Sequence, residues 1–303
     1  MSGPDPVLSD PLAALAPGAR LWQHAAGILD CSRGHLIGIV NATPDSFTDE
    51  GRHFGTAASV AHGLTLAGQG ASVIEVGGES LRFSAPTDVA EEIARVVPVI
   101  RELAETVAQP IAIDTFKPAV AEAAIAAGAA ILNDPTGLRD PEMMRVAARS
   151  EVGVVLTHFF GEPKVRPTSF PDVDVPRAVI AWAHGMLART DDAGIARTRI
   201  AIDPGVGLGK SSEQDLAILH RLHELRVLER PIFVPISNKK VLGAMTGRAA
   251  HERLGPSAAG VVWCRVRGAS LFRVHDVGFL HDVLTTTEAL ITGAPEQWHE
   301  VIK

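Results

Sequence analysis

Polar and charged side chains follow the apolar runs of this chain in a regular pattern. The apolar run Leu36–Val40 ends directly in Asn41, and later apolar runs also end in acidic, amide, basic or imidazole side chains. Any single Asn or Asp in such a place is explained by turn formation, but its recurrence at every run is not. The residues at these ends are Asn41, Glu75, Asp114, Asn133, Asp134, His158, Asp203, Ser237, Lys239, Arg273 and His275.

Four of these residues carry the groups that a flat nitrogen heterocycle needs. Asp114, Asn133, Asp203 and Lys239 supply two carboxylates, an amide and an ammonium group. Carboxylates and an amide can accept and donate along the edge of a heterocycle, while the lysine can donate to its carbonyl group. Buried polar groups of this kind discriminate strongly, because a wrong ligand leaves them unpaired.

Three other residues indicate an anion site. Arg273 and His275 are two residues apart in the last apolar run, so they point to the same side of a strand. Together with Asn41 they form a polar, partly cationic patch that suits a phosphate or pyrophosphate. The sequence therefore predicts a heterocycle site beside an anion site.

A repeating pattern of strand and helix would position these residues. Between the apolar runs lie helical stretches, such as the one that opens at Lys117-Pro118 with proline in its first turn. Eight strands alternating with helices predict an α/β protein with a (β/α)8 TIM barrel, in which polar residues gather at the carboxyl ends of the strands. An open doubly wound sheet is the alternative. The expected strands are Leu36–Val40, Ser72–Val76, Ile111–Ile113, Ala130–Leu132, Gly153–Thr157, Arg199–Ile202, Ile232–Pro235 and Ser270–Val274.

Composition restricts the class of protein. The chain has 303 residues, and its 46% hydrophobic and 21% charged residues are typical of a globular protein. The net charge of −7 argues against a nucleic-acid or membrane-surface protein, and no apolar run is long enough for a membrane span. Two cysteines, Cys31 and Cys264, fit the reducing cytoplasm. We expect a loose N-terminal arm over residues 1–25 and a single domain over residues 26–303.

The segment Gly205-Val-Gly-Leu-Gly-Lys-Ser211 differs from a Walker A phosphate loop in its glycine spacing. We interpret it as a turn that lets a ligand approach the backbone after Asp203.

Seven segments together resemble dihydropteroate synthase, a family that folds as a (β/α)8 barrel. The resemblance runs in order from about Ala26 to about Leu290. The segments are Asn41-Ala-Thr-Pro-Asp-Ser-Phe47, Glu75-Val-Gly-Gly-Glu-Ser80, Asp114-Thr-Phe-Lys-Pro118, Ile131-Leu-Asn-Asp134, Asp203-Pro-Gly-Val-Gly-Leu-Gly-Lys210, Ser237-Asn-Lys239 and Arg273-Val-His-Asp276.

The resemblance implies an activity: condensation of 6-hydroxymethyl-7,8-dihydropterin pyrophosphate with 4-aminobenzoate in folate biosynthesis, with release of pyrophosphate. It also implies Mg2+ as the cofactor, bound near Asn41, two small-molecule substrates and a homodimer. The residue roles that it implies are as follows: Glu75, Asp114, Asn133, Asp203, Lys239 and Arg273 bind the pterin; Asn41, Arg273 and His275 bind the pyrophosphate; Asp45 and Lys239 are catalytic; and Phe47, Leu81, Arg82, Phe83 and Asn238 lie on the aminobenzoate side.

The chain departs from the family pattern at several positions. Glu75 stands where the family usually has Asp, and Leu81 and Phe83 interrupt the usual Thr-Arg-Pro-Gly, of which Arg82 remains. Asn238 replaces an arginine, whose charge and stacking area asparagine cannot supply.

These departures leave two alternatives to a working synthase. One is a paralogue that binds the pterin pyrophosphate but joins it to another acceptor, or only binds it. The other is a pterin-binding methyltransferase domain that works with a corrinoid protein. The retained Arg273-Val-His275 and the segment from Asn41 to Phe47 argue against the methyltransferase.

Overall fold

The main structural feature of the chain is a parallel sheet that curls into a barrel. The computed structural model describes residues 20–42, 55–80, 85–165 and 170–294. Within these ranges eight parallel strands are ordered β8-β7-β6-β5-β4-β3-β10-β9. A parallel bridge between Ile202 and Ile232 joins the two end strands, and the N–H of Ile202 donates to the Pro231 carbonyl at 2.9 Å. The sheet therefore closes, and the fold is the predicted (β/α)8 TIM barrel.

All eight expected strands are present, with boundaries that differ by at most two residues. Gly153–Thr157 matches its prediction, whereas β9 is shorter than expected because Pro235 has no N–H to donate to a neighbouring strand. The barrel strands are β3 (His35–Asn41), β4 (Val73–Gly77), β5 (Ile111–Asp114), β6 (Ile131–Asp134), β7 (Gly153–Thr157), β8 (Ile200–Asp203), β9 (Phe233–Val234) and β10 (Leu271–Val274).

Each strand directs alternate residues to the inside and the outside of the barrel. Residues such as Ile74, Ile113 and Leu132 belong to the large apolar cluster shared with the helices. Their neighbours along the strands, such as Val73, Ala112 and Ile131, form a second cluster inside the barrel. Two residues further along β4, β5, β6, β7, β8 and β10, the inward positions become polar. The apolar inner cluster thus forms a base beneath the polar residues.

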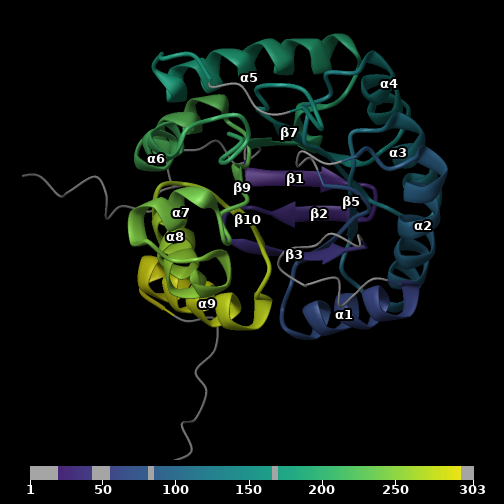
Figure 1. Cartoon of the computed structure of the whole chain (residues 1–303), viewed down its shortest axis with the longest axis horizontal. Coiled ribbons are helices and arrows are strands. Elements are labelled where there is room, and N and C mark those ends of the chain that lie inside the picture. The colour runs from purple at the N-terminus through teal and green to yellow at the C-terminus, as the bar shows by residue number, and fades with distance from the viewer. Residues whose placement is uncertain (1–19, 43–54, 81–84, 166–169, 295–303) are drawn as a thin grey trace, which may run out of the picture.

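A β-hairpin closes the amino end of the barrel. The antiparallel strands β1 (Leu21–His24) and β2 (Gly27–Asp30) precede the barrel, and Figure 1 shows them across the opening of the helix ring. Trp22 is 1% exposed, lies in the inner apolar cluster and donates its Nε1–H to the Arg199 carbonyl at 2.9 Å. The prediction of a loose arm as far as residue 25 is therefore wrong for Leu21–His24, because burial of Trp22 attaches this segment to the barrel. Residues 1–19 of that arm lie outside the described residues.

Helices surround the barrel and connect successive strands (Figure 1). Asp88 and Asp174 cap α2 and α5, accepting from the N–H groups of Ala90 and Arg177. The helices are α1 (Thr56–Gly68), α2 (Val89–Thr106), α3 (Pro118–Ala126), α4 (Pro141–Arg149), α5 (Val175–Asp192), α6 (Ser212–His220), α7 (Lys240–Thr246), α8 (Leu254–Val266) and α9 (Val277–Thr292), with 3-10 turns at η2 (Arg197–Arg199), η3 (Leu222–Leu228) and η4 (Ala250–Glu252).

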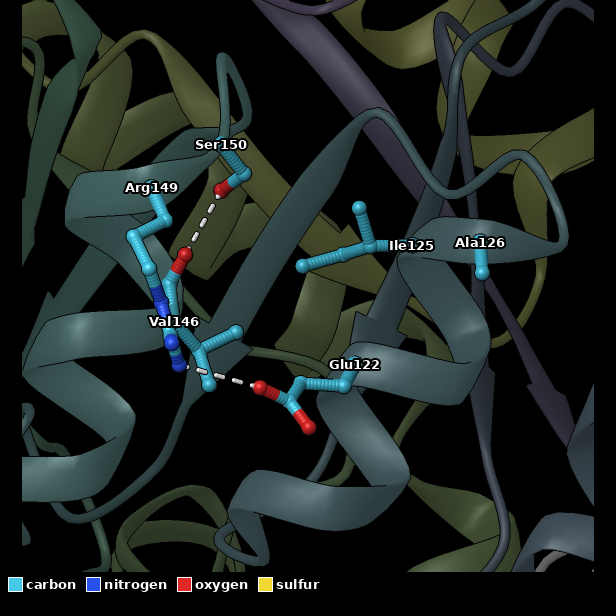
Figure 2. Close-up of a pocket in the computed structure, with 6 residues that line it drawn as sticks. All are labelled: Glu122, Ile125, Ala126, Val146, Arg149 and Ser150. Atoms are coloured by element: carbon cyan, nitrogen blue, oxygen red, sulfur yellow. Dashed lines mark hydrogen bonds and ion pairs between the residues drawn. The ribbon is translucent and has the colours of Figure 1, made fainter.

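The outer surface carries a small pocket between α3 and α4 (Figure 2). Ile125 and Val146 line it, and an ion pair between Arg149 and Glu122 at 3.1 Å spans one side. This pocket is formed by the helices and not by the strand ends, so it is separate from the residues predicted to do chemistry. In the described part of the chain, no helix combines the length and apolar character that a membrane span requires.

Candidate active site

The polar residues predicted from the strand ends lie in the inward layer directly above the apolar base. Strand register brings them together: Asp114 is paired with Asn133, and Asp203 with Thr157. Glu75 and Arg273 lie two residues beyond the inner-cluster members Val73 and Leu271. Parallel strands end at the same edge, so side chains that are distant in sequence meet at the carboxyl end of the barrel.

Arg273 connects this layer through two carboxylates. Its Nε forms an ion pair with Glu75 Oε1, and its Nη2 donates to Asp114 Oδ2 at 2.7 Å. The side chain of Glu75 is 1% exposed, whereas those of Asp114 and Arg273 are 18% and 22% exposed. The guanidinium group therefore lies above a buried carboxylate and retains access from the rim.

Asn133 is fixed from below by the same carboxylate. Its Nδ2 donates to Glu75 Oε2 at 2.9 Å, and the residue is 5% exposed. Its Oδ1 is buried and has no hydrogen-bond partner among the described residues. An unsatisfied buried acceptor is costly, so this oxygen is available for an N–H donor from a ligand.

Asp203 is held by the turn that follows β8. Its Oδ1 accepts the N–H of Gly205 at 2.7 Å. Gly205, Gly207 and Gly209 all have positive φ, at 73°, 80° and 74°, a conformation that glycine adopts without steric cost. A Cβ on Gly205 would lie 1.9 Å from the carbonyl oxygen of His158. The glycines therefore allow this turn to lie directly against the end of β7.

Two lysines hold the same turn. Lys210 Nζ donates to the carbonyls of His158 and Gly205 at 3.1 and 2.9 Å, and burial lowers the pKa of Lys210 to about 8. Lys239 Nζ donates to the Val206 carbonyl at 2.8 Å, and its stem lies beside Gly207. Lys239 is partly exposed, so its ammonium group lies at the rim close to Asp203.

Burial raises the pKa of two carboxyl groups in this layer towards neutrality. It raises the pKa of Asp114 to about 7, a shift that the Arg273 charge opposes and the Glu75 charge increases. It raises the pKa of Asp203 to about 6, against the Gly205 N–H and the Lys239 charge. Perturbed carboxyl groups at a strand-end rim are typical of functional sites, because desolvation strengthens every interaction with a ligand.

The residues predicted for the anion lie at the adjoining strand ends. His275 follows β10, and its Nδ1 is hydrogen-bonded to Ser237 Oγ at 3.0 Å. Asn41 is the last residue of β3, pairs with Gly77 of β4 and is partly exposed. Because β3 and β10 are neighbouring strands, Asn41, Arg273 and His275 share one sector of the rim.

Asn238 occupies a left-handed backbone conformation with φ of 59°. Its N–H donates to Ser257 Oγ at 3.1 Å, and its carbonyl accepts from Arg253 Nη1 at 2.9 Å. Asparagine tolerates this conformation better than most residues. The backbone geometry therefore gives a local reason for asparagine at this position.

A buried ionic network at the rim was not predicted from the sequence. Lys117 Nζ lies 2.6 Å from Glu79 and 2.7 Å from Glu92, and Lys164 Nζ lies 2.9 Å from Glu79. The Thr87 N–H donates to Glu79 at 2.7 Å. Burial alone would raise the pKa of Glu79, but these partners outweigh burial and lower it. Lys117 follows β5 within a segment that carries the resemblance. This position after a strand was the sequence feature that could have placed Lys117 at the rim.

Two other strand-end residues have structural partners. Asp134 accepts from the N–H groups of Thr136 and Leu138 at 2.8 and 2.9 Å and so forms a turn. The His158 ring packs edge-on against Phe170 and Trp182, and burial lowers the pKa of His158 to about 3. Turn formation and aromatic packing account for these two residues.

The remaining predicted site residues follow β3 and β4 in the sequence. Asp45 and Phe47, and Leu81, Arg82 and Phe83, lie outside the described residues. Their roles stay predictions.

A parallel barrel with a buried acidic, amide and guanidinium layer defines a class of enzyme that binds a polar heterocycle at the strand ends. Residues 37–275 match the family described as pterin binding enzyme. The dihydropteroate synthase of Escherichia coli (strain K12) is 35% identical over 273 residues, which cover 90% of this chain and 97% of that protein. The dihydropteroate synthase of Neisseria meningitidis serogroup B (strain MC58) is 36% identical over 278 residues, which cover 89% and 97%.

Solved structures give the same result. Xanthomonas albilineans dihydropteroate synthase with 4-aminobenzoic acid is 41% identical with a TM-score of 0.81, over 88% of this chain and 96% of that one. Burkholderia cenocepacia dihydropteroate synthase complexed with 7,8-dihydropteroate is 33% identical with a TM-score of 0.81, over 90% and 97%. The chain belongs to the dihydropteroate synthase family of pterin binding enzymes.

Proposed function

We propose that the protein condenses 6-hydroxymethyl-7,8-dihydropterin pyrophosphate with 4-aminobenzoate, forming 7,8-dihydropteroate and pyrophosphate. The observation that carries the proposal is the Glu75–Arg273–Asp114 ion-pair set beside the unsatisfied Asn133 oxygen. It combines acceptors for the N–H groups of a pterin with a cation for its diphosphate. Relatives with 33–41% identity carry 4-aminobenzoic acid or dihydropteroate in their structures, which supports the same chemistry.

The pterin is held by the buried layer. Asp114, Asn133 and Asp203 present oxygen atoms to the ring N–H and amino groups, and Lys239 donates to the ring carbonyl. Asp203 keeps one oxygen for the ligand, because the other accepts from Gly205. Ionised Asp114 and Asp203 are the binding-competent forms, since a protonated carboxyl group has lost part of its capacity to accept.

The reaction needs the bond between the pterin methylene carbon and the diphosphate oxygen to break. The electron pair leaves with the diphosphate, the methylene carbon gains carbocation character, and the aromatic amine attacks it and loses a proton. Arg273, His275 and Asn41 bind the departing diphosphate, where preorganised cations and donors lower the barrier most. The rigid pairing of Arg273 fixes its remaining donors before the substrate arrives.

Asn41 would hold Mg2+ in this sector, next to the diphosphate. The described residues contain no group of three or more His, Cys, Asp or Glu side chains placed to hold a metal ion. Mg2+ typically keeps several waters and binds substrate phosphates with few protein ligands, so one hard oxygen from Asn41 suits it. When bound, it would neutralise charge on the leaving diphosphate.

The second substrate would lie on the side of the rim that includes Asn238. Phe47, Leu81, Arg82 and Phe83 are proposed to shape this side, and Asp45 to act with Lys239 at the reacting centre. Phe47 and Phe83 offer aromatic surface, and Arg82 offers a cation for the aminobenzoate carboxylate.

The test is to incubate the purified protein with dihydropterin pyrophosphate, Mg2+ and 4-aminobenzoate and to follow dihydropteroate and pyrophosphate. Equal amounts of the two products are expected. Pterin pyrophosphate binding without dihydropteroate would contradict the proposed reaction and leave only the binding function.

The protein is proposed to act as a homodimer. Exposed apolar side chains occur on α6, α7 and α8, and these helices are neighbours along the chain and in space. They are Leu216, Met245, Leu254, Val262 and Trp263. A second copy of the chain would cover them, and Met245→Glu should then convert a dimer to a monomer in sedimentation analysis.

The cytoplasm is the proposed compartment. Cys31 and Cys264 are both buried free thiols, as a reducing environment favours. The net charge of −7 supports small-molecule substrates over nucleic acid.

A further inference from the structure

Glu75 lies at the centre of the buried layer, where each of its two oxygens contacts a neighbouring side chain. Its Oε1 is paired with Arg273 Nε and its Oε2 accepts from Asn133 Nδ2 at 2.9 Å. The side chain is 1% exposed. Both oxygens are thus committed to neighbouring side chains, so a direct contact with the pterin is not its main role.

A carboxylate paired with a guanidinium group only accepts hydrogen bonds. It therefore fixes which end of the Asn133 amide it faces: the NH2 group must turn to Glu75, and Oδ1 must turn away. That oxygen is buried and has no partner among the described residues. A neutral amide would normally match either a donor or an acceptor by rotating, but this one is restricted to accepting.

We propose that Glu75 is a positioning residue that determines specificity: it locks Asn133 as an obligatory acceptor and thereby selects a heterocycle with an N–H donor, the pterin 2-amino group. The inference rests on the proposed pterin function. The same carboxylate orients Arg273, so one buried charge sets both the acceptor for the ring and the direction of the guanidinium group. A site of this kind rejects a ligand that lacks the donor, because the amide oxygen then stays unpaired.

The experiment compares the affinities of two probes, 6-hydroxymethylpterin and its 2-desamino analogue, measured by calorimetry. The wild-type protein should prefer the pterin by about 100-fold or more, since buried hydrogen-bonding sites discriminate strongly. In Glu75→Gln the new amide can donate to Asn133, which is then free to rotate. The preference should fall by about 10-fold or more. Glu75→Asp keeps an acceptor-only group and should keep the preference, even if both affinities weaken.

A side-chain exchange provides the sharper test. In the double variant Glu75→Gln/Asn133→Asp, the amide and the carboxylate change places, so the new carboxylate accepts from Gln and presents its second oxygen to the ligand. The buried charge and hydrogen bond are both kept, so this variant remains informative if Glu75→Gln alone does not fold. The pterin preference should return.

Glu288→Gln is the matched control. Glu288 pairs with buried Arg265 at 3.0 Å near the amino end of the barrel, so its loss should lower stability and leave the preference unchanged. An unchanged preference in Glu75→Gln, or no recovery in the exchange variant, would overturn the inference. If the wild-type protein binds neither probe and no pterin pyrophosphate, the proposed function itself fails instead.

Discussion

Replacing Arg273 by methionine should destabilise the protein in a pH-dependent way. The substitution keeps an unbranched apolar stem and removes the cation shared by Glu75 and Asp114. Removing one partner of a buried ion pair leaves an uncompensated charge and typically costs about 3–5 kcal/mol. Asp114 makes this cost depend on pH, because its carboxyl group can be protonated to remove the charge.

The direction of this pH dependence follows from the pKa of Asp114. Burial raises it to about 7, although Arg273 opposes the shift. Without Arg273 it rises further, so the folded variant binds more protons than the wild type at pH 7 and above. Each further unit by which the Asp114 pKa rises lowers the free energy of unfolding by about 1.4 kcal/mol at pH values above the raised pKa. At pH 5.5 Asp114 is already largely protonated in both proteins, so the difference there is smaller.

The assay is urea unfolding of both proteins at pH 5.5 and pH 8.5. The destabilisation should be larger at pH 8.5 by about 1–3 kcal/mol. Arg265→Met is the control, since it removes a buried guanidinium group from Glu288 at the other end of the barrel. It should cost a similar amount at both pH values. Equal destabilisation by Arg273→Met at the two pH values would refute the coupling between Arg273 and Asp114.

Three further predictions concern binding and stability. Pterin affinity should rise as the pH passes through about 7 and Asp114 ionises, and Asp114→Asn should weaken this rise. Calorimetry at pH 5.5, 6.5 and 7.5 would contradict the idea if both proteins showed the same slope. Gly205→Ala should lower Tm by several degrees and reduce pterin affinity, because its Cβ would lie 1.9 Å from the His158 carbonyl oxygen, whereas an unchanged Tm would show that the turn relaxes freely. Trp22→Ala should cost about 3–5 kcal/mol in urea unfolding, and a loss below 1 kcal/mol would mean that the hairpin does not support the barrel.

The strands were predictable because each is a short apolar run between helical stretches. The strand predicted at Gly153–Thr157 is β7 with the same bounds, and the glycines Gly70, Gly128 and Gly268, which end the helical stretches before three other strands, have positive φ. The hairpin was missed because only Trp22, His24 and Leu29 of its two strands are buried, with exposed neighbours between them. Such a short segment has too little periodicity to be separated from a loose arm.

The site was predictable in position but not in its internal pairing. The polar residues at the ends of the expected strands included Glu75, Asp114, Asn133 and Arg273, and parallel strands end at one rim. These positions could not show that Glu75 uses both oxygens within the protein, since that depends on side-chain length and on the stagger between strands. For the same reason they could not separate Asp134, which forms a turn, from its neighbour Asn133.

The buried ionic network shows a similar limit. Lys117 and Glu79 lie in segments that the resemblance covers, but their partners Glu92 and Lys164 lie in a helix and a distant loop. Nothing in their spacing indicates contact, because the contact is created by the curvature of the barrel.

The central claim is that side chains from separate strands bind one pterin pyrophosphate at a single rim. The most direct measurement is calorimetric titration of the wild-type, Asp203→Asn, Arg273→Met and Arg265→Met proteins with 6-hydroxymethyl-7,8-dihydropterin pyrophosphate and Mg2+. We expect one ligand per chain, with affinity reduced at least about 10-fold by each of the two rim substitutions and unchanged by Arg265→Met. Wild-type affinity in Asp203→Asn and Arg273→Met would contradict the claim.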